Sequence, residues 1–443
     1  MARAEEEPPW CGPRGGDRGR RLVADGPKFA VGLTLLITAV SIAPAARALD
    51  APRVHGSIRY DTFVYGDRDK AGDTWENYAV LDIRARGRLT DELTYRMQAR
   101  MYADDVHFTA GAFSVRNDQR RRPYVQLAEG VVDYRPTGRL RISVGKQYVN
   151  WSAFDEIQPA NVMSTRDESD PFRVVDLGLY GVALHYDHDF GDFEFFVVPM
   201  AFTPVRLPQG RWNIVRDNVA KIQDLPPVRV EETQAAIRLG FEVEQLEVDV
   251  FAYVGRDFSA VFIPEVVFVG GEDRLDVRII DRYPRIRVGG MNATYPLSES
   301  LLARLETVYF SSPEDYQDNF IHVVIGGEYS FRDFRLVVNY LREEITKRSD
   351  IEITDKGERR FFRSLIFGEV LYDAGGRLRA RFQAGYDTRG EFTILQPEIS
   401  YRLWRELRAG LSGVVIDSKR GTDRYFDRIR HEDRFGADLT YSF

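Results

Sequence analysis

The last eleven residues of the chain, Asp433 to Phe443 (DRFGADLTYSF), decide the fold class. Apolar side chains occupy every second position from Phe435 onward, and polar or small side chains lie between them. Since a strand has a period of two residues, this stretch predicts a strand with one apolar and one polar face. Its length matches the about ten residues that a tilted strand needs to cross a bilayer core.

The terminal aromatic residue is a second signal. A C-terminal strand that ends in Phe443, with Tyr441 two residues earlier, resembles the closing strand of bacterial outer-membrane β-barrels. The resemblance implies that this strand is recognised by the barrel-assembly machinery and that the protein contacts outer-membrane lipid. An amphipathic strand at the end of a soluble sandwich has the same local pattern, so the rest of the chain must decide.

The N-terminus predicts export from the cytoplasm. An apolar run from Phe29 to Ala43 follows several basic residues and precedes an A-x-A sequence at residues 46–48. These parts correspond to the n-region, h-region and cleavage site of a signal peptide, which we assign to residues 1–48. A retained anchor helix is the alternative, but the run is short for a spanning helix and Pro44 ends it.

The exported part of the chain is acidic and free of cysteine. Removal of residues 1–48 changes the net charge from −7 to −9 and removes Cys11, the only cysteine. A secreted chain without cysteine is not held together by disulfides. Residues 49–443 would form a single domain in the periplasm, in the outer membrane or outside a Gram-negative-type cell.

A short repeat recurs along the exported chain: a tyrosine that ends an alternating strand, a polar turn, and a new strand. The four clearest copies are Tyr134-RPTGR-Leu140, Tyr295-PLSES-Leu301, Tyr372-DAGGR-Leu378 and Tyr401-RLWRE-Leu407. Each copy predicts a β-hairpin. Tyrosines at the same place in successive hairpins predict an aromatic girdle at one membrane interface.

Alternation of this kind predicts eighteen strands, from residues 55–66 to residues 432–443. The long connections are residues 104–123, 150–177, 203–231, 258–284, 346–361 and 418–431. They alternate with short turns, except that the connection at residues 389–391 is short where a long one is expected. Short turns on one side and long loops on the other are typical of transmembrane barrels. The predicted fold class is therefore all-β: an antiparallel transmembrane β-barrel of about eighteen strands, with sixteen as the alternative count.

A soluble two-sheet β protein is the competing fold. On the strand from Leu378 to Asp387, apolar residues alternate with Arg379, Arg381 and Gln383. A sandwich could bury the apolar face, but its strands are short and recur at intervals of about 8–12 residues. Lipid outside and water inside explain both faces of these longer strands.

Arginines gather on the predicted lumen face of several strands. We predict that the pore is lined by Arg84, Arg86, Arg88, Arg96, Arg100, Arg238, Arg377, Arg379 and Arg381. The chain has 54 arginines and 7 lysines, and a guanidinium binds carboxylate, phosphate or sulfate with a planar fork. Rings of arginine bias a pore toward anions. In the alternative interpretation these arginines pair with lumen acids and only brace the wall.

The connection from Val144 to Arg173 is the most distinctive loop sequence, and it could narrow the pore together with residues 203–231. Its apolar residues predict a small cluster within the loop, and its charged residues predict a mixed-charge face. The constriction candidates are Trp151, Asp155, Arg166, Asp167, Asp170 and Arg173. An ordinary surface loop is the alternative. Its acids could bind Ca²⁺ or form a solvated charge cluster.

This loop also carries a family resemblance. A strand ending in Gly145-Lys146-Gln147, followed by a loop with Trp, Asp and Pro, resembles porin-like outer-membrane families, including the eighteen-stranded alginate-export type. In such families long loops fold into or over the lumen and set its selectivity, and export-type members line the channel with arginine. The resemblance implies channel roles for Arg84, Arg86, Arg96, Arg100 and Arg379.

No sequence feature predicts catalysis, a cofactor, a metal site or nucleic-acid binding. The chain has no G-x-S-x-G, H-E-x-x-H or glycine-rich phosphate loop. His185 and His188 lie three residues apart at a strand end, so their rings should point to opposite faces. We therefore expect the protein not to be an enzyme.

The sequence thus predicts a cell outer-membrane channel, either a porin or an export pore. Small or extended anionic solutes, with polysaccharide as one candidate, would pass by passive diffusion. The alternative from another functional class is a non-conducting barrel that acts as a scaffold or receptor within an envelope complex.

Overall fold

The computed structural model describes residues 51–66, 74–106, 108–116, 118–199, 202–213, 220–269, 274–350, 360–420 and 425–443. The predicted signal peptide, residues 1–48, lies outside these residues. Within them, no helix is both long enough and apolar enough to cross a membrane.

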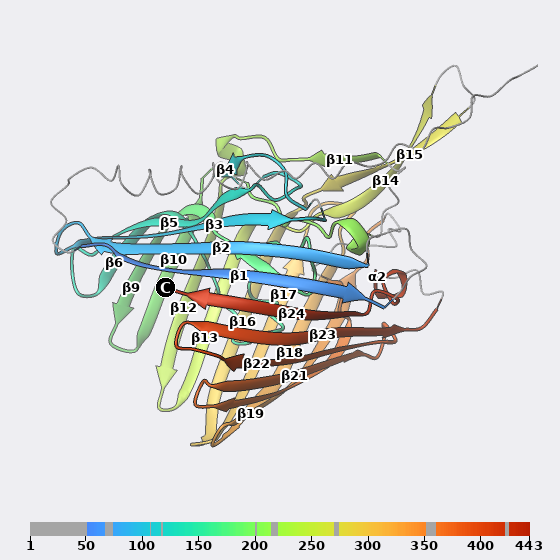
Figure 1. Cartoon of the computed structure of the whole chain (residues 1–443). Coiled ribbons are helices and arrows are strands. Elements are labelled where there is room, and N and C mark those ends of the chain that lie inside the picture. Colours follow the sequence, from blue (N-terminus) through green and yellow to red (C-terminus); the bar gives the residue numbers. More distant parts are fainter. Residues whose placement is uncertain are drawn as a thin grey trace, which may run out of the picture. The chain divides into compact units, whose positions relative to one another are not determined.

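Eighteen antiparallel strands in the described part of the chain close into one barrel (Figure 1). They are β1 (Arg53–Tyr65), β2 (Trp75–Arg88), β3 (Leu93–Asp104), β5 (Val125–Tyr134), β6 (Leu140–Gln147), β9 (Leu179–His188), β10 (Gly191–Val198), β12 (Gln234–Val243), β13 (Leu246–Arg256), β16 (Arg285–Ser298), β17 (Leu301–Ser311), β18 (Asn319–Phe331), β19 (Phe334–Lys347), β20 (Ser364–Ala374), β21 (Leu378–Asp387), β22 (Phe392–Arg402), β23 (Leu407–Ser418) and β24 (Arg434–Ser442). Strand β1 pairs with β24 to close the sheet, and Asp61 lies opposite Asp438. The predicted strand count and closing pair are confirmed, and the alternative count of sixteen is wrong.

The connections also follow the prediction, because short turns alternate with longer loops. The short link between β21 and β22, at residues 388–391, is confirmed. The loops contain further elements that the sequence did not predict: β4 (Phe113–Ser114), β7 (Thr165–Asp167), β8 (Val175–Leu177), β11 (Ala220–Asp224), β14 (Val261–Val269), β15 (Arg274–Arg282), η1 (Gly210–Trp212), η2 (Val230–Glu232) and α2 (Tyr425–Arg428). Strands β14 and β15 form a hairpin, and β15 pairs in parallel with β11.

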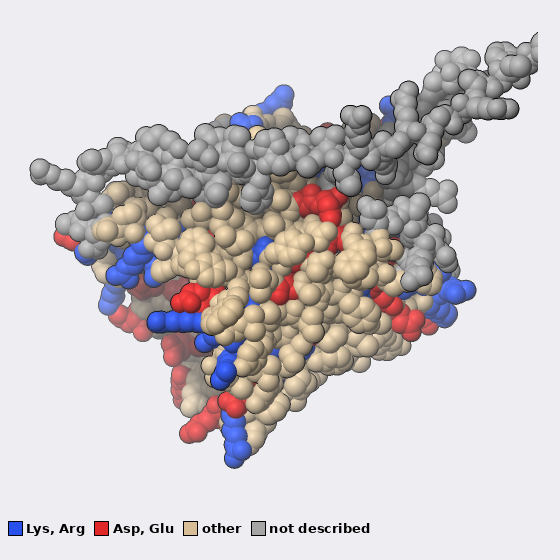
Figure 2. Space-filling model, in the orientation of Figure 1, with Lys and Arg blue, Asp and Glu red and all other residues tan. Residues whose placement is uncertain are grey.

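The outer face of the barrel is apolar and the inner face carries buried charge. On β24, Phe435 is 62% exposed, whereas the neighbouring Arg434 is 2% exposed and turns inward. Uncharged residues dominate the barrel face in view, and many of its charged side chains gather toward the strand ends (Figure 2). Tyr134, Tyr295 and Tyr401 are exposed near the short turns, in agreement with the predicted girdle. This distribution suits lipid outside and polar groups inside.

Part of the interior is apolar, which the strand pattern did not predict. Inward-facing side chains of β9 to β18, including Phe196, Phe251, Val308 and Phe310, belong to a buried hydrophobic cluster. The cluster exists because a long loop folds into the barrel and covers these side chains. On this side of the barrel the interior is therefore filled by apolar side chains of the wall and the loop.

Deletion of Phe443 tests the closing strand. The backbone N–H of Phe443 donates to the Gly56 carbonyl at 2.9 Å, and the Gly56 N–H donates to the Phe443 carbonyl at 2.9 Å. Loss of both bonds and of the terminal aromatic group should impair insertion but leave export to the periplasm intact. Fractionation with heat-modifiable electrophoresis measures the inserted fraction. Phe443→Tyr should insert normally, and wild-type insertion of the deletion variant would contradict the assembly role.

Candidate functional site: the lumen and its loops

The loop between β6 and β9, residues 148–178, folds into the barrel, and we call it the inner loop. Glu306 on β17 is fully buried and accepts hydrogen bonds from the Ser152 hydroxyl at 2.7 Å and from the backbone N–H groups of Ala153 at 3.0 Å and Ala160 at 2.6 Å. One lumen carboxylate thus satisfies three donors of the loop. These bonds fix the first part of the inner loop against the wall.

Aromatic residues of the inner loop complete this attachment. Trp151 packs against Phe251, with ring centroids 6.0 Å apart. Phe154 lies in a second cluster with Val324 and Phe367, which point inward from β18 and β20. The prediction of a small apolar cluster within the loop is therefore wrong. Trp151, Phe154 and Phe172 instead belong to or pack against three different clusters that include wall residues, and burial of apolar area there is favourable.

A buried ion triad joins the inner loop to two other loops. Asp167 accepts hydrogen bonds from Arg122 at 2.8 Å and from Arg206, and the three side chains are at most 3% exposed. Arg122 belongs to residues 105–124, and Arg206 belongs to residues 199–233. Burial by itself would raise the pKa of Asp167, but the two guanidinium groups outweigh burial and hold its pKa well below the usual range. Neither Arg122 nor Arg206 lies in a periodic stretch that predicts its position.

The last part of the inner loop is tied to the strands that close the barrel. Asp170 accepts two hydrogen bonds from Arg434 on β24, at 2.5 and 3.1 Å. Arg173 donates to Asp61 on β1 at 2.7 Å. Asp167 and Asp170 therefore face guanidinium groups in buried positions, and the expectation of a solvated charge cluster is wrong. The other two charged constriction candidates, Asp155 and Arg166, are more exposed to solvent. Asp155 is 3.6 Å from Arg335, and Arg166 donates a hydrogen bond to Gln158.

The GKQ sequence at the end of β6 has a structural explanation. Gly145 has a φ of 133°, and a Cβ there would collide with the Gly130 carbonyl. The adjoining Lys146 is fully buried, and its ammonium donates to the carbonyls of Leu127 at 2.7 Å and Val115 at 3.0 Å. Lys146 thereby attaches the segment around β4 to the barrel.

Several of the predicted pore arginines are paired with acids of the same strand, of a neighbouring strand or of the adjoining turn. The pairs are Arg84 with Asp82, Arg88 with Asp91, Arg96 with Glu129 and Asp133, Arg100 with Asp82, Arg238 with Asp192, Glu194 and Asp249, and Arg381 with Glu398. Arg86 and Arg379 are exposed. Arg377 lies in the turn before β21, where its guanidinium is 5.5 Å from the Tyr401 ring, so it belongs to the rim and not to the same row.

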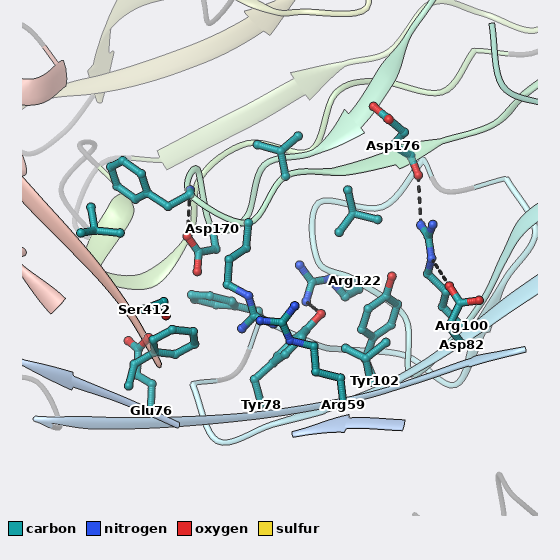
Figure 3. A pocket seen from close by; sticks show the side chains of 18 of the residues that line it. Arg59, Glu76, Tyr78, Asp82, Arg100, Tyr102, Arg122, Asp170, Asp176 and Ser412 are labelled. Atoms are coloured by element: carbon teal, nitrogen blue, oxygen red, sulfur yellow. Dashed lines mark hydrogen bonds and ion pairs between the residues drawn. The ribbon is translucent and has the colours of Figure 1, made fainter. Parts of the chain in front are cut away.

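A cavity of about 780 Å³ lies on the side of the lumen opposite the buried cluster. It is lined by inward-facing residues of β1, β2, β3 and β21 to β24 and by the end of the inner loop. Figure 3 shows Arg100 between Asp82 and the backbone of Asp176. We call this space the arginine cavity.

The arginine cavity is lined by Arg59 from β1, Tyr78 from β2 and Tyr102 from β3. The sequence prediction missed the two tyrosines. Each lies on the same face of its strand as an arginine predicted to face the lumen, Arg84 on β2 and Arg100 on β3. Counting every polar residue on that face of each strand would have found both tyrosines.

Two histidines behave as expected. His185 lies 3.7 Å from Glu194 on the lumen side, whereas His188 lies against Phe190, with ring centroids 4.0 Å apart. The two rings thus have separate surroundings. Within the described residues, no group of three or more His, Cys, Asp or Glu side chains could hold a metal ion.

Comparison with known proteins identifies the fold. No protein-family model matches the chain, and no curated protein matches its sequence. OccAB3 of Acinetobacter baumannii is 11% identical and has a TM-score of 0.50, with 88% of this chain and 99% of that chain covered. A variant of the Rh. blastica porin is 12% identical with a TM-score of 0.42, covering 89% of this chain and 100% of that chain. The likeness to OccAB3 shows that this chain has the fold of a porin-like outer-membrane β-barrel.

Asp167→Asn tests whether the ion triad holds the loops in the lumen. The change leaves Arg122 and Arg206 buried beside a neutral amide, and removing one member of a buried ion pair costs about 3–5 kcal/mol. The inner loop should become accessible to trypsin while the barrel keeps its heat-modifiable band. Mass spectrometry of the fragments locates the cuts. Asp155→Asn is the matched control, because Asp155 lies in the same loop with a side chain that is 64% exposed. Equal protection of both variants would contradict the role of the triad.

Proposed function

We propose that the protein is an outer-membrane channel that passes anionic solutes by passive diffusion. One observation carries the anion preference: Arg53, Arg86 and Arg96 lie side by side on β1, β2 and β3 and face the lumen. Glu129 and Asp133 pair with Arg96, whereas Arg53 and Arg86 are exposed. Like charges directly opposite each other destabilise a sheet, so this row gains from a passing anion.

A second feature supports the same preference. Asp82 is shared by Arg84 and Arg100, each with a guanidinium nitrogen 3.1 Å from a carboxylate oxygen. One carboxylate between two guanidinium groups leaves an excess positive charge on this wall. The side chain of Arg84 is 67% exposed, so its charge acts on the open space.

The architecture supports a channel in the outer membrane. The apolar outer face and the porin-like fold suit a lipid bilayer, and an eighteen-stranded barrel is too wide for wall side chains alone to fill. The inner loop covers one side of the lumen and leaves the arginine cavity on the other. Small anions fit this space, and an extended anionic polysaccharide, which the alginate-export resemblance implies, would meet the same arginines.

Charge reversal in the lumen tests the proposal. We expect open-channel steps in planar bilayers with a preference for anions over cations. Replacing Arg84, Arg86 and Arg379 with Glu should reverse that preference, because three positive charges are lost from the lumen wall and three negative charges are added. Zero-current potentials in a salt gradient give the permeability ratio.

A matched control carries the same charge change outside the lumen. Arg139, Arg332 and Arg405 lie in short turns and are exposed, so their replacement with Glu should leave the ratio nearly unchanged. Equal effects of the two triple variants would contradict a lumen role. A barrel that stays silent at high protein load would instead favour the non-conducting scaffold or receptor.

The selectivity should also depend on pH through Glu156 in the inner loop. Burial and the nearby Glu369 carboxylate raise the pKa of Glu156 to about 7. The group is neutral below that pH and negative above it, so the anion preference should fall as the pH rises from about 6 to about 8. Glu156→Gln should remove this step in the zero-current potential. An unchanged step in that variant would assign it to another group.

A further inference from the structure

We propose that the preferred solutes are amphiphilic organic anions, each with an apolar ring and a single anionic group. This inference rests on the proposed channel function and names the class of solute. It is carried by two adjoining spaces of opposite chemistry, one aromatic and one rich in arginine.

The first space is a cavity of about 340 Å³ between the inner loop and the strands β19 to β22, which we call the aromatic cavity. Its apolar lining includes Phe172, Phe361, Phe362, Phe367, Tyr425 and Phe426. Polar residues also contribute to the lining, among them Arg166, Gln383 and the acids Glu156 and Glu168. A lining in which apolar and aromatic side chains predominate is typical of sites that bind small organic molecules.

The second space is the arginine cavity, and the two spaces share part of their lining. Phe172, Val174 and Gln396 line both cavities. Arg173, the residue between Phe172 and Val174, lines only the arginine cavity of the two and lies with its guanidinium 4.3 Å from the Tyr78 ring. One short segment of the inner loop therefore offers a ring on one side and a cation on the other.

This arrangement favours a solute with both kinds of group. A hydrated inorganic anion gains little from the aromatic cavity, because it has no apolar surface to remove from water. A neutral aromatic molecule gains nothing from the excess positive charge near Asp82. A ring that carries one anionic group can bury its apolar part beside Phe172 while the anionic group meets the arginines.

Sugar rings also stack on aromatic side chains, but the lining of the aromatic cavity suits them less well. Besides its aromatic residues, the cavity is lined by the aliphatic residues Ile157, Leu341, Leu365 and Ile394. Hydroxyl groups placed against such side chains lose hydrogen bonds to water without replacement, which is costly. The observations therefore favour an apolar ring.

Planar-bilayer recordings with the full-length channel test the inference. The probes are 3-phenylpropionate, propionate, which lacks the ring, and 3-phenylpropan-1-ol, which lacks the charge. We expect 3-phenylpropionate to interrupt the chloride current at a concentration about tenfold lower than either of the others, because both parts of the solute bind. Equal potency of the three probes, or greater potency of propionate, would overturn the inference while the chloride current itself still supports the channel. Absence of any chloride current would overturn the channel function.

Two variants locate the effect. Phe172→Ala and Phe362→Ala should each raise the half-blocking concentration of 3-phenylpropionate severalfold and leave that of propionate unchanged. Phe362→Ala is included because Phe172 also contacts Trp212, with ring centroids 5.3 Å apart, and its loss could loosen the loop. Phe190→Ala, in an exposed turn, is the matched control and should have no effect. If neither cavity variant changes the block by 3-phenylpropionate, the aromatic cavity is not the binding site.

Discussion

The lumen depends on the carboxylate of Asp167, which lies between two guanidinium groups from two other loops. Two cations around one buried anion need further stabilisation. Arg122 receives it from the Tyr102 ring, whose centroid is 4.6 Å away, and from the Tyr78 hydroxyl, to which it donates at 2.6 Å. If the inner loop moved away, both guanidinium groups would lose the carboxylate that they share. The three loops therefore behave as one unit inside the barrel.

The consequence is an asymmetric lumen. Trp151 and Phe154 attach the inner loop to the inward faces of β9 to β20, where apolar side chains form dry clusters. The polar passage is left to the strands on the other side, from β21 through the closing pair to β3. In the proposed channel, the side chains of only part of the circumference would set the selectivity. Arginines elsewhere are paired with acids of the wall, as Arg238 is with Asp192, Glu194 and Asp249.

The strands could be predicted from the sequence because lipid and the interior act on alternate residues. Phe435 is favourable facing lipid and Arg434 facing the interior. A shift of the strand register by one residue would exchange the two positions. The paths of the loops could not be predicted in this way. Phe154 meets Val324 about 170 residues later in the chain, and no local period encodes that contact. The lumen arginines on strands followed from parity, whereas Arg122 in a loop did not.

Bracing the wall and attracting anions are compatible roles for the same arginines. A guanidinium has five N–H donors, and a bidentate carboxylate occupies two of them. Arg84 donates one N–H to Asp82 while most of its side chain stays exposed, so other donors remain available to a passing anion. A lysine ammonium is more strongly hydrated and lacks this planar fork. Pairing with acids relieves the repulsion between arginines on neighbouring strands. Where guanidinium groups outnumber carboxylates, the unbalanced charge makes the electrostatic potential in the lumen positive.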